Sequence, residues 1–350
     1  MLALVKNQQA PGAEISEVPI PRPGQGEVLL KVHRASICGS DLPIYFWTSW
    51  ATARIKPPLV FGHELCGEVV ETAPGADVFK PGDKVAVESH IFCGYCATCS
   101  AGDRHLCRRM ALVGIDRPGG FAEYVALPER VLWKLNAKLP YDFASLMEPL
   151  GNALYATTVE PVEGKTVLIL GCGPQGLFAV QVAKAMGAKF VVAVEKSEFR
   201  AAMAKKLGAD KVISGAPSDK ELIEQVLSFD GVREGYDACL EMSGSTFLVN
   251  VGFRALRNGG RMSLFGLTAG KTGIDLGEDV IFKGLRIYGI LGRKLFSTWE
   301  QMEALLLSGK AHLDASVSHV LPLTDFDKAF SILVSPQKAC GKILFKIGRN

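Results

Sequence analysis

The first 150 residues differ from the rest of the chain in the spacing of their apolar residues. Their apolar stretches are short, and Pro and Gly interrupt them often. The clearest stretches are EVLLKVHRAS (27–36), CGEVVET (66–72), DKVAVES (83–89) and FAEYVAL (121–127). Short runs bounded by turn residues are typical of β-strands. The pattern predicts a compact β-rich domain over residues 1–150.

Near Glu163 the pattern changes to bare apolar runs that alternate with helical periodicity. KTVLIL (165–170) leads into the glycine-rich GCGPQG (171–176), after which Phe178, Val182 and Met186 recur at helical spacing. Similar strand-like runs follow at 190–195, 211–214, 236–242, 261–266 and 285–291, with helical segments between them. Apolar strands that alternate with helices predict an α/β fold with a doubly wound parallel sheet over residues 151–293.

Residues 294–350 carry two helical runs and two strand-like runs, the last of them GKILFKI (341–347). A closing strand needs a partner, because its backbone edges would otherwise be uncovered. We therefore expect residues 294–350 to return to the β-rich domain.

Composition narrows the class of protein. A length of 350 residues fits two domains, and 48% hydrophobic with 21% charged residues is typical of a globular protein. The net charge is +3, and no basic run is interleaved with aromatic residues, so we expect no nucleic-acid partner. The apolar runs are shorter than a membrane span and the N-terminus has no signal pattern, so we expect a cytoplasmic protein without a membrane partner.

Four of the nine cysteines lie close together, as Cys93, Cys96, Cys99 and Cys107 in the pattern C-x2-C-x2-C-x7-C. In a chain without an export signal this indicates a metal site, not a disulfide framework. Four thiolates fill a tetrahedron around Zn²⁺ and leave no open position, so the zinc would be structural. An iron–sulfur cluster could use similar spacing, but the C-x3-C-P ending is absent. We expect a structural zinc lobe over residues 93–107.

The glycines Gly171, Gly173 and Gly176 form G-x-G-x-x-G between a buried strand and a helix. The first permits a tight turn, the second lets the backbone approach a pyrophosphate, and the third packs the helix on the strand. The helix N-terminus adds amide donors and a positive dipole. In this context the motif predicts a Rossmann nucleotide-binding unit.

A carboxylate at the end of the next strand indicates which nucleotide binds. Glu195 follows Gly176 by 19 residues, a place from which it can accept hydrogen bonds from both ribose hydroxyls. A carboxylate there would also repel a 2′-phosphate, so NAD is the predicted cofactor. Lys196 and Arg200 lie close by and keep NADP open as the alternative.

Three further residues could form a second metal site. Cys38 precedes His63 by 25 residues, and Glu148 lies at the boundary between the two predicted domains. Each residue type is common in protein interiors for reasons unrelated to metals. Together, one thiolate, one imidazole and one carboxylate would leave a fourth position open, which a catalytic zinc requires.

The order of these motifs along the chain resembles that of a known enzyme family. ICGSD (37–41), GHELCGEVV (62–70), PGDKVAV (81–87), the cysteine lobe, EPLGNA (148–153) and the glycine-rich turn follow the order seen in zinc-dependent medium-chain alcohol dehydrogenases. The chain resembles that family over essentially its whole length. The resemblance implies a GroES-like, β-rich catalytic domain that the C-terminal strands rejoin, a Rossmann domain, and a cofactor in the cleft between them.

The resemblance also implies roles for individual residues. Cys38, His63 and Glu148 would bind the catalytic zinc, with Glu64 beside it as an exchangeable ligand, and Ser40 would hydrogen-bond the alcohol. His90 and Arg293 are the candidates near the substrate. The implied cofactor contacts are Gly171, Gly173, Pro174, Gln175, Gly176, Glu195, Arg200, Phe265, Ile290 and Leu291.

The implied activity is zinc-dependent oxidation of a secondary alcohol, with hydride transfer to NAD⁺, by a homo-oligomer that the family suggests is a tetramer. Residues 44–58, 87–96 and 287–310 are most similar to members that oxidise L-threonine to 2-amino-3-oxobutanoate. A polyol or vicinal-diol dehydrogenase of the sorbitol or 2,3-butanediol type is the alternative. A non-enzymatic nucleotide-binding protein on the same fold is a third hypothesis, because fold does not fix function.

One position departs from the family pattern. A His commonly stands three residues after the Ser or Thr of this motif and completes a proton route to solvent, and here that position is Pro43. Proline has no titratable group and no backbone N–H. Either the proton leaves through water or Glu64, or the pocket serves an alcohol other than threonine.

Overall fold

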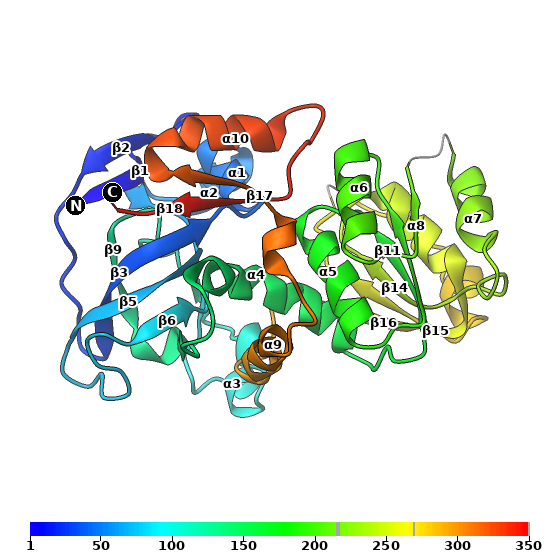
Figure 1. The fold of residues 1–350 in the computed structure, drawn as a ribbon, viewed down its shortest axis with the longest axis horizontal. Helices are drawn as coiled ribbons and strands as arrows, with labels where there is room; N and C mark the ends of the chain where they lie inside the picture. Colours follow the sequence, from blue (N-terminus) through cyan, green and yellow to red (C-terminus); the bar gives the residue numbers. More distant parts are fainter. Residues whose placement is uncertain (215–217, 269, 349–350) are drawn as a thin grey trace.

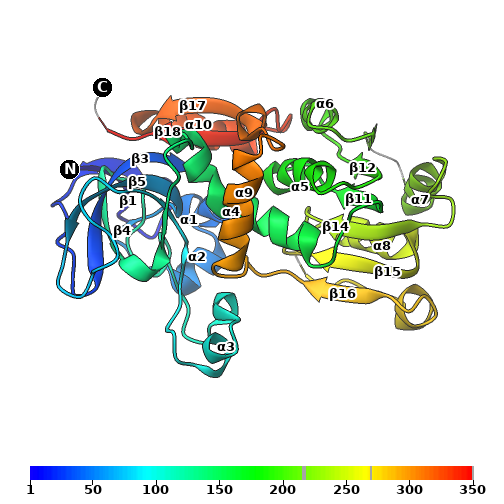
Figure 2. The same cartoon turned by 60° about the horizontal axis from the view of Figure 1, so that its bottom comes forward.

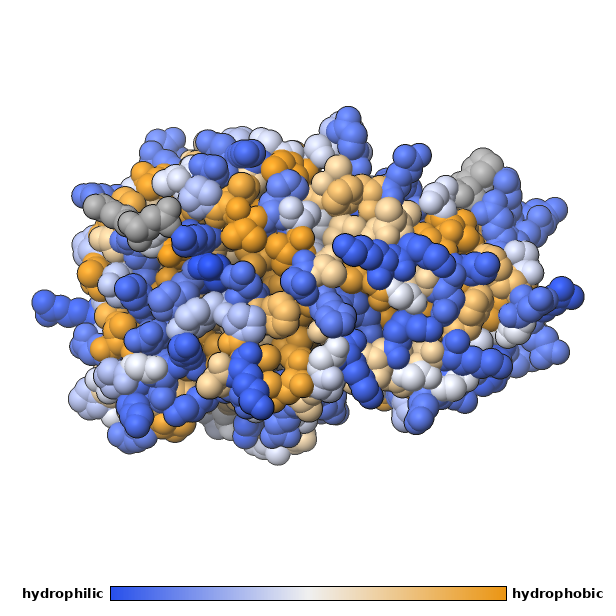
Figure 3. Space-filling model, viewed as in Figure 1, coloured by the Kyte–Doolittle hydropathy of each residue, from blue (hydrophilic) through white to orange (hydrophobic). Residues whose placement is uncertain are grey.

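The computed structural model describes residues 1–214, 218–268 and 270–348. A β-rich half and an α/β half lie side by side, with helix α4 (Tyr141–Thr158) between them (Figure 1). Hydrophilic side chains cover both ends of the face in Figure 3, whereas apolar ones gather in its middle, where the halves meet. The described helices are all too short or too polar to cross a membrane.

The β-rich half is built on one large sheet in which β3 is central. β3 pairs antiparallel with β5, β9 and β18. The strands of this sheet are β3 (Glu27–Ser36), β5 (Glu64–Thr72), β6 (Lys84–Val87), β9 (Tyr124–Pro128), β10 (Leu132–Lys134), β17 (Val317–Pro322) and β18 (Lys342–Lys346).

Smaller elements complete this half. A three-stranded sheet contains β1 (Leu2–Lys6), β2 (Glu14–Glu17) and β4 (Leu59–Val60), and a ribbon contains β7 (His90–Ile91) and β8 (Ala111–Leu112). Its helices include α1 (Asp41–Tyr45), α2 (Ser49–Arg54), α3 (Ala97–Ser100) and α10 (Phe326–Val334).

The α/β half contains six parallel strands, as predicted. In spatial order they are β13 (Lys211–Ile213), β12 (Phe190–Val194), β11 (Thr166–Leu170), β14 (Tyr236–Glu241), β15 (Leu256–Leu264) and β16 (Arg286–Gly289). Its helices are α5 (Pro174–Ala185), α6 (Glu198–Lys206), α7 (Asp219–Leu227) and α8 (Thr246–Ala255).

Both faces of this sheet are buried. Val167 and Ile169 of β11 pack into a core with α4 and α5, whereas the alternate residues Leu168 and Leu170 pack into a second core with α8. Because side chains alternate across a strand, helices on both faces require strands that are apolar throughout. The predicted doubly wound sheet is confirmed.

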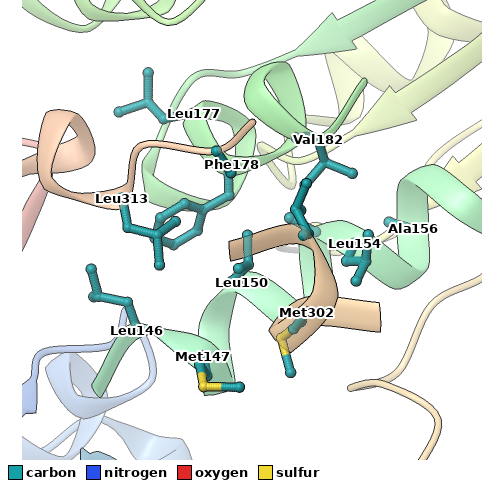
Figure 4. Close-up of a cluster of buried hydrophobic side chains, with 14 of the residues drawn as sticks. Leu146, Met147, Leu150, Leu154, Ala156, Leu177, Phe178, Val182, Met302 and Leu313 are labelled. Atoms are coloured by element: carbon teal, nitrogen blue, oxygen red, sulfur yellow. The ribbon is translucent and has the colours of Figure 1, made fainter. Parts of the chain in front are cut away.

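Helix α4 joins the two halves through its apolar side chains. Leu150 lies between Phe178 of α5 and Met302 of α9 (Ser297–Leu307) (Figure 4). These side chains belong to the largest buried cluster, which continues into both halves. Residues on α4 are therefore held firmly relative to the β-rich half and the α/β half.

The end of the chain lies in the first sheet. β18 pairs with β3, with Leu344 opposite Ser36, and β17 lies parallel to β18 at the edge. The strand-like run at 341–347 thus has the partner that the sequence required. The exact domain boundaries, at residues 150 and 293, stay predictions.

Candidate active site

Sheet pairing brings three predicted metal ligands together. Cys38 follows β3, while His63 and Glu64 stand at the start of β5, and the pairing of Ser36 with Glu64 sets these strand ends side by side. The ligand atoms of Cys38, His63 and Glu64 lie within 4.8 Å of one another. This Cys38–His63–Glu64 group lies in the β-rich half.

Asp41 lies against both Cys38 and His63. Its Oδ2 accepts a hydrogen bond from the Cys38 backbone N–H at 2.9 Å, and its Oδ1 lies 3.5 Å from His63 Nδ1. Burial opposes a charged imidazole, but the Asp41 carboxylate and the Cys38 thiolate raise the pKa of His63 well above its ordinary value. A carboxylate on one ring nitrogen leaves the other free for a metal. Ser40 Oγ lies 3.3 Å from that nitrogen, Nε2.

The group fits a zinc ion. His63 is 6% exposed and Glu64 fully buried. Glu64 Oε1 is buried without a hydrogen-bond partner among the described residues. Buried polar atoms without partners are costly, and a bound cation would satisfy this one. Thiolate, imidazole and carboxylate oxygen are the donors that Zn²⁺ takes at about 2.0–2.3 Å.

Glu148 is held beside this group by other partners. Its Oε1 accepts hydrogen bonds from Arg293 Nη2 and Ser89 Oγ, both at 2.6 Å. The structure groups it with Glu88 and His90, and Glu64 stands nearer to Cys38 and His63. Glu148 nevertheless adds to the raised pKa of Glu64, for which burial is the largest cause. The two carboxylates therefore face one region of the site.

Arg293 is fully buried, and the described structure leaves its guanidinium no donor for a substrate. Nε and Nη2 donate to Glu88 at 2.8 and 2.7 Å, and Nη1 donates to the Glu148 carbonyl and to Asn152 Oδ1. Although burial alone would raise it, Arg293 holds the pKa of Glu88 well below its usual range. The structure thus places Arg293 between two carboxylates, and a direct contact with substrate is not supported.

His90, the other candidate near the substrate, joins the same network. Its Nδ1 lies 2.7 Å from Glu88 Oε1 and 3.0 Å from Arg293 Nη2. The side chain is 12% exposed, so part of the ring reaches solvent. His90 therefore remains a candidate for substrate contact, braced through Nδ1.

Residues of the EPLGNA motif contact the Arg293 side chain and leave room for it. Glu148 and Asn152 supply acceptors, and a Cβ on Gly151 would lie 2.5 Å from Arg293 Cδ. Contacts that close are essentially never seen for a real Cβ, so this helix position needs glycine. The motif thus holds α4, the Glu148 carboxylate and the Arg293 side chain in fixed positions relative to one another.

The predicted structural lobe also comes together. The sulfurs of Cys93, Cys96, Cys99 and Cys107 lie within 4.8 Å of one another. Backbone N–H groups of Cys93 and Arg109 donate to Cys107 Sγ at 3.2 and 3.3 Å. The Thr98 hydroxyl and nearby backbone amides lower the pKa of Cys96 to about 5. Burial raises the pKa of Cys99 to about 12, so the hydrogen bonds favour a thiolate at Cys96 in particular, whereas a four-sulfur zinc site requires thiolates at all four positions.

The predicted dinucleotide turn lies between β11 and α5. Gly171 has φ = +89°, which favours glycine, and Pro174 takes the first helical position, where its missing N–H costs nothing. A Cβ on Gly176 would overlap the Gly171 carbonyl oxygen, whereas one on Gly173 would meet nothing within 4 Å. Gln175 Oε1 is buried without a partner among the described residues. The turn therefore fits a pyrophosphate.

Alanine substitutions at Gly176 and Gly173 are expected to have opposite effects on stability and on cofactor binding. Gly176→Ala should lower the free energy of unfolding of the cofactor-free protein by about 1–3 kcal/mol, because the new methyl overlaps backbone. Gly173→Ala should leave that stability unchanged and raise the KM for NAD⁺, because its methyl points into the space for the pyrophosphate. Urea unfolding and steady-state kinetics measure both, and equal stability of the two variants would contradict this account.

Glu195 directly follows β12, and Arg200 lies in the first turn of α6. Glu195 is 7% exposed, and its two oxygens accept hydrogen bonds from the backbone N–H groups of Cys172 and Ser197, each at 2.8 Å. Arg200 Nε donates to the Cys340 carbonyl at 2.9 Å. The carboxylate is thus fixed beside the glycine-rich turn, where the resemblance expects it.

Phe265 follows β15, and Ile290 and Leu291 follow β16. Because all six strands are parallel, their carboxyl ends meet at one edge of the sheet, together with the turn and Glu195. The structure places all predicted cofactor residues at this edge. Their contacts with a cofactor stay predictions.

Sequence reasoning missed several residues that shape the site. Asp41 lies inside the ICGSD motif, and Glu88 lies two residues before His90, so an acidic residue close to a predicted site residue was a usable signal. Lys342 gave no such signal, since it looks like an ordinary strand-end lysine in sequence. Its side chain nevertheless contacts Glu64 in the fold.

Known proteins match the whole chain. The family model "Alcohol dehydrogenase GroES-like domain" matches residues 24–137, and "Zinc-binding dehydrogenase" matches residues 174–308. The L-threonine 3-dehydrogenase of Pyrococcus abyssi is 44% identical over 349 residues, 99% of each chain.

Solved structures agree with the fold. A zinc-binding dehydrogenase from Sinorhizobium meliloti bound to NADP superimposes with a TM-score of 0.88 at 28% identity, covering 99% of this chain and 98% of that one. The 2R,3R-butanediol dehydrogenase of Bacillus subtilis gives 0.86 at 27% identity and covers 99% of both chains. Both domains of the predicted fold are confirmed. Because the matches include the metal-ligand segments, the cysteine lobe and the nucleotide turn, this chain belongs to the zinc-dependent medium-chain alcohol dehydrogenases, which oxidise alcohols with a nicotinamide cofactor.

Proposed function

We propose that this enzyme oxidises L-threonine to 2-amino-3-oxobutanoate, with NAD⁺ as the hydride acceptor. The observation that carries the proposal is the Cys38–His63–Glu64 group, in a chain 44% identical to an L-threonine 3-dehydrogenase over 99% of its length. A buried metal site with an open position suits activation of a hydroxyl group.

The chain's own residues bind and orient the reactants. When bound, zinc supplies a Lewis acid that lowers the pKa of the substrate hydroxyl, and NAD⁺ accepts the hydride. Cys38, His63 and Glu64 would hold the metal, and Glu148 is the further ligand that the family resemblance implies. Ser40, 3.3 Å from His63 Nε2, is placed to accept a hydrogen bond from the substrate hydroxyl.

We propose NAD over NADP as the cofactor. Glu195 is fixed just after β12 by two backbone N–H groups, and its negative charge would repel a 2′-phosphate. Arg200, one of the two nearby cations that could bind such a phosphate, donates to the Cys340 carbonyl, while Lys196 is the other. The enzyme should therefore use NAD⁺ with the higher kcat/KM.

A neutral polyol or vicinal diol is the second candidate substrate. Threonine carries an ammonium and a carboxylate, and the buried Arg293 leaves no donor for that carboxylate. Pro43, which is half-buried on α1, supplies no proton relay. The structural similarity to a butanediol dehydrogenase supports the same alternative.

A substrate panel tests the two candidates. The zinc-loaded enzyme is assayed with NAD⁺ and, separately, L-threonine, L-serine, sorbitol and 2,3-butanediol, and the appearance of NADH is followed. Threonine is expected to give the highest kcat/KM, by at least about tenfold. A higher value for a diol would move the assignment to the second candidate, and no NADH with any alcohol would overturn the proposal.

We further propose that the protein is a homo-oligomer that associates through the edge strand β16. Among the described residues β16 pairs only with β15, and Figure 2 shows it at the margin of the sheet. Large apolar side chains exposed nearby in the chain are Leu276, Ile281, Phe282, Ile287 and Leu291. An open edge flanked by apolar side chains favours pairing with a second copy about a two-fold axis.

A charge in this region should break the association. Phe282, 75% exposed, is replaced by Lys, and the molar mass in solution is measured by light scattering during size exclusion. The mass is expected to fall to a smaller assembly, because two lysines would face each other across the axis. Val78→Lys, at a 72% exposed position of the other half, is the control. An unchanged mass for Phe282→Lys would exclude this surface.

We also infer a cytoplasmic location. All nine cysteines are free of disulfides, and four of them form the lobe. Thiols in this state are typical of reducing compartments.

A further inference from the structure

Each of the two carboxylates at the candidate metal site pairs with a buried cation, and the two cations differ. Arg293 pairs with Glu148, and Lys342 pairs with Glu64. The Lys342 side chain is 2% exposed and that of Glu64 is 1% exposed, so water screens neither charge. The motifs and the predicted mechanism account for Glu148, but they give Lys342 no role.

Lys342 contacts only one oxygen of Glu64. Its Nζ donates to Glu64 Oε2, and Ser36 Oγ donates to the same oxygen. Glu64 Oε1 receives no hydrogen bond from the described residues, although it is buried. Two donors on one oxygen fix the rotation of the carboxylate, and the other oxygen is left for a different partner.

The same ammonium also reaches the segment that carries Cys38. Lys342 Nζ donates to the carbonyl of Ile37, the residue before Cys38, at 2.9 Å. One cation therefore ties together the two segments that bear Cys38 and Glu64. This contact depends on the C-terminal strand, since β18 is the neighbour of β3 on the side away from β5.

We propose that Lys342, assisted by Ser36, is a positioning residue for the catalytic metal. It holds Glu64 through Oε2, so that Oε1 faces the site as a ligand beside Cys38 and His63. This inference rests on the proposed catalytic zinc site. The competing explanation is that Lys342 only neutralises a buried carboxylate and has no influence on metal binding.

Replacing Lys342 by Met separates the two explanations. Zinc affinity is measured by competition with a chromophoric chelator on the full-length protein, and the cysteine lobe serves as an internal control in the same molecule. The affinity of the catalytic site should fall about 10- to 100-fold, as for other residues that orient a metal ligand. The visible spectrum of the cobalt-substituted site should change, while the lobe keeps its metal. A catalytic-site affinity within threefold of wild type, with an unaltered cobalt spectrum, would overturn the inference.

Lys6→Met is the matched control. Lys6 is 1% exposed, and its ammonium donates to the backbone carbonyls of Ala10, Gly12 and Tyr45, none of which is a carboxylate of the site. Loss of this buried cation should leave the zinc affinity of the catalytic site unchanged. An equal loss of affinity in Lys6→Met and Lys342→Met would show a general effect of removing a buried lysine, against the proposal.

A double variant makes the test specific. In Glu64→Gln protein, Lys342→Met should change the zinc affinity by less than threefold, because the oxygen it positions is no longer a charged ligand. Should Lys342→Met fail to fold, Ser36→Ala removes one hydrogen bond from the same oxygen, and a smaller loss of affinity is then expected. Wild-type protein that binds one zinc in place of two would instead contradict the proposed function itself.

Discussion

Cys38→Ala is expected to abolish the catalytic zinc and nearly all activity. The thiolate is one of three ligand atoms that lie within 4.8 Å of one another, and zinc that loses one of its few protein ligands is bound poorly. A Lewis-acid contribution of about 4 kcal/mol or more corresponds to about a 10³-fold or greater fall in kcat/KM. Metal analysis of the purified variant should give about one zinc per chain, held by the cysteine lobe, in place of about two.

Cys66→Ala is the control for Cys38→Ala. Cys66 is fully buried in β5, two residues beyond Glu64, and its Sγ donates to the Tyr141 carbonyl. It lies close to the site without belonging to the Cys38–His63–Glu64 group, so this variant should keep both zinc ions and its activity. Retention of two zinc ions by Cys38→Ala would contradict the ligand assignment.

Arg293→Leu is expected to cost about 3–5 kcal/mol of folding free energy, because it leaves Glu88 and Glu148 buried without their shared cation. The same change should reduce kcat/KM for L-threonine and for 2,3-butanediol by similar factors, since Arg293 contacts the carboxylates of the protein and is fully buried. Chemical unfolding and kinetics on both substrates measure these effects. A rise in KM for threonine alone would show that Arg293 does contact the substrate.

Arg286→Leu provides the comparison for Arg293→Leu. Arg286 also forms an ion pair, with Glu160 at 2.6 Å, but its side chain is 48% exposed. Solvent-exposed pairs contribute about 1 kcal/mol or less, so the loss of stability should be small. Adding Glu88→Gln to Arg293→Leu should restore part of the lost stability, because it removes one of the two uncompensated charges.

The fold could be predicted from local patterns because each strand and helix is indicated by a short, continuous stretch of sequence. VLIL (167–170) in KTVLIL is apolar at every position, as a strand buried on both faces requires, and both faces of β11 are indeed covered. The cysteine lobe was equally local, with all four ligands inside residues 93–107. Where a site is built from one short segment, its sequence pattern identifies it.

Contacts between distant segments were not predictable in the same way. The resemblance placed Arg293 near the substrate, but the direction of its side chain depends on packing against α4 and on the space left by Gly151. Lys342 meets Glu64 only because β18 joins β3. A sequence records neither the rotamer of a long side chain nor the strand that will lie beside it.

The position of β18 bears on when this enzyme is completed during synthesis. The ribosome makes Ser36, Cys38 and Glu64 early, whereas Lys342 and Leu344 emerge only after the entire α/β half. At about 5–20 residues per second, roughly 15–60 s separate the two ends of this sheet. During that interval the nascent chain carries a thiol and a carboxylate that lack their cation and their neighbouring strand. Metal captured by the unfinished chain would bind a site different from that of the released protein.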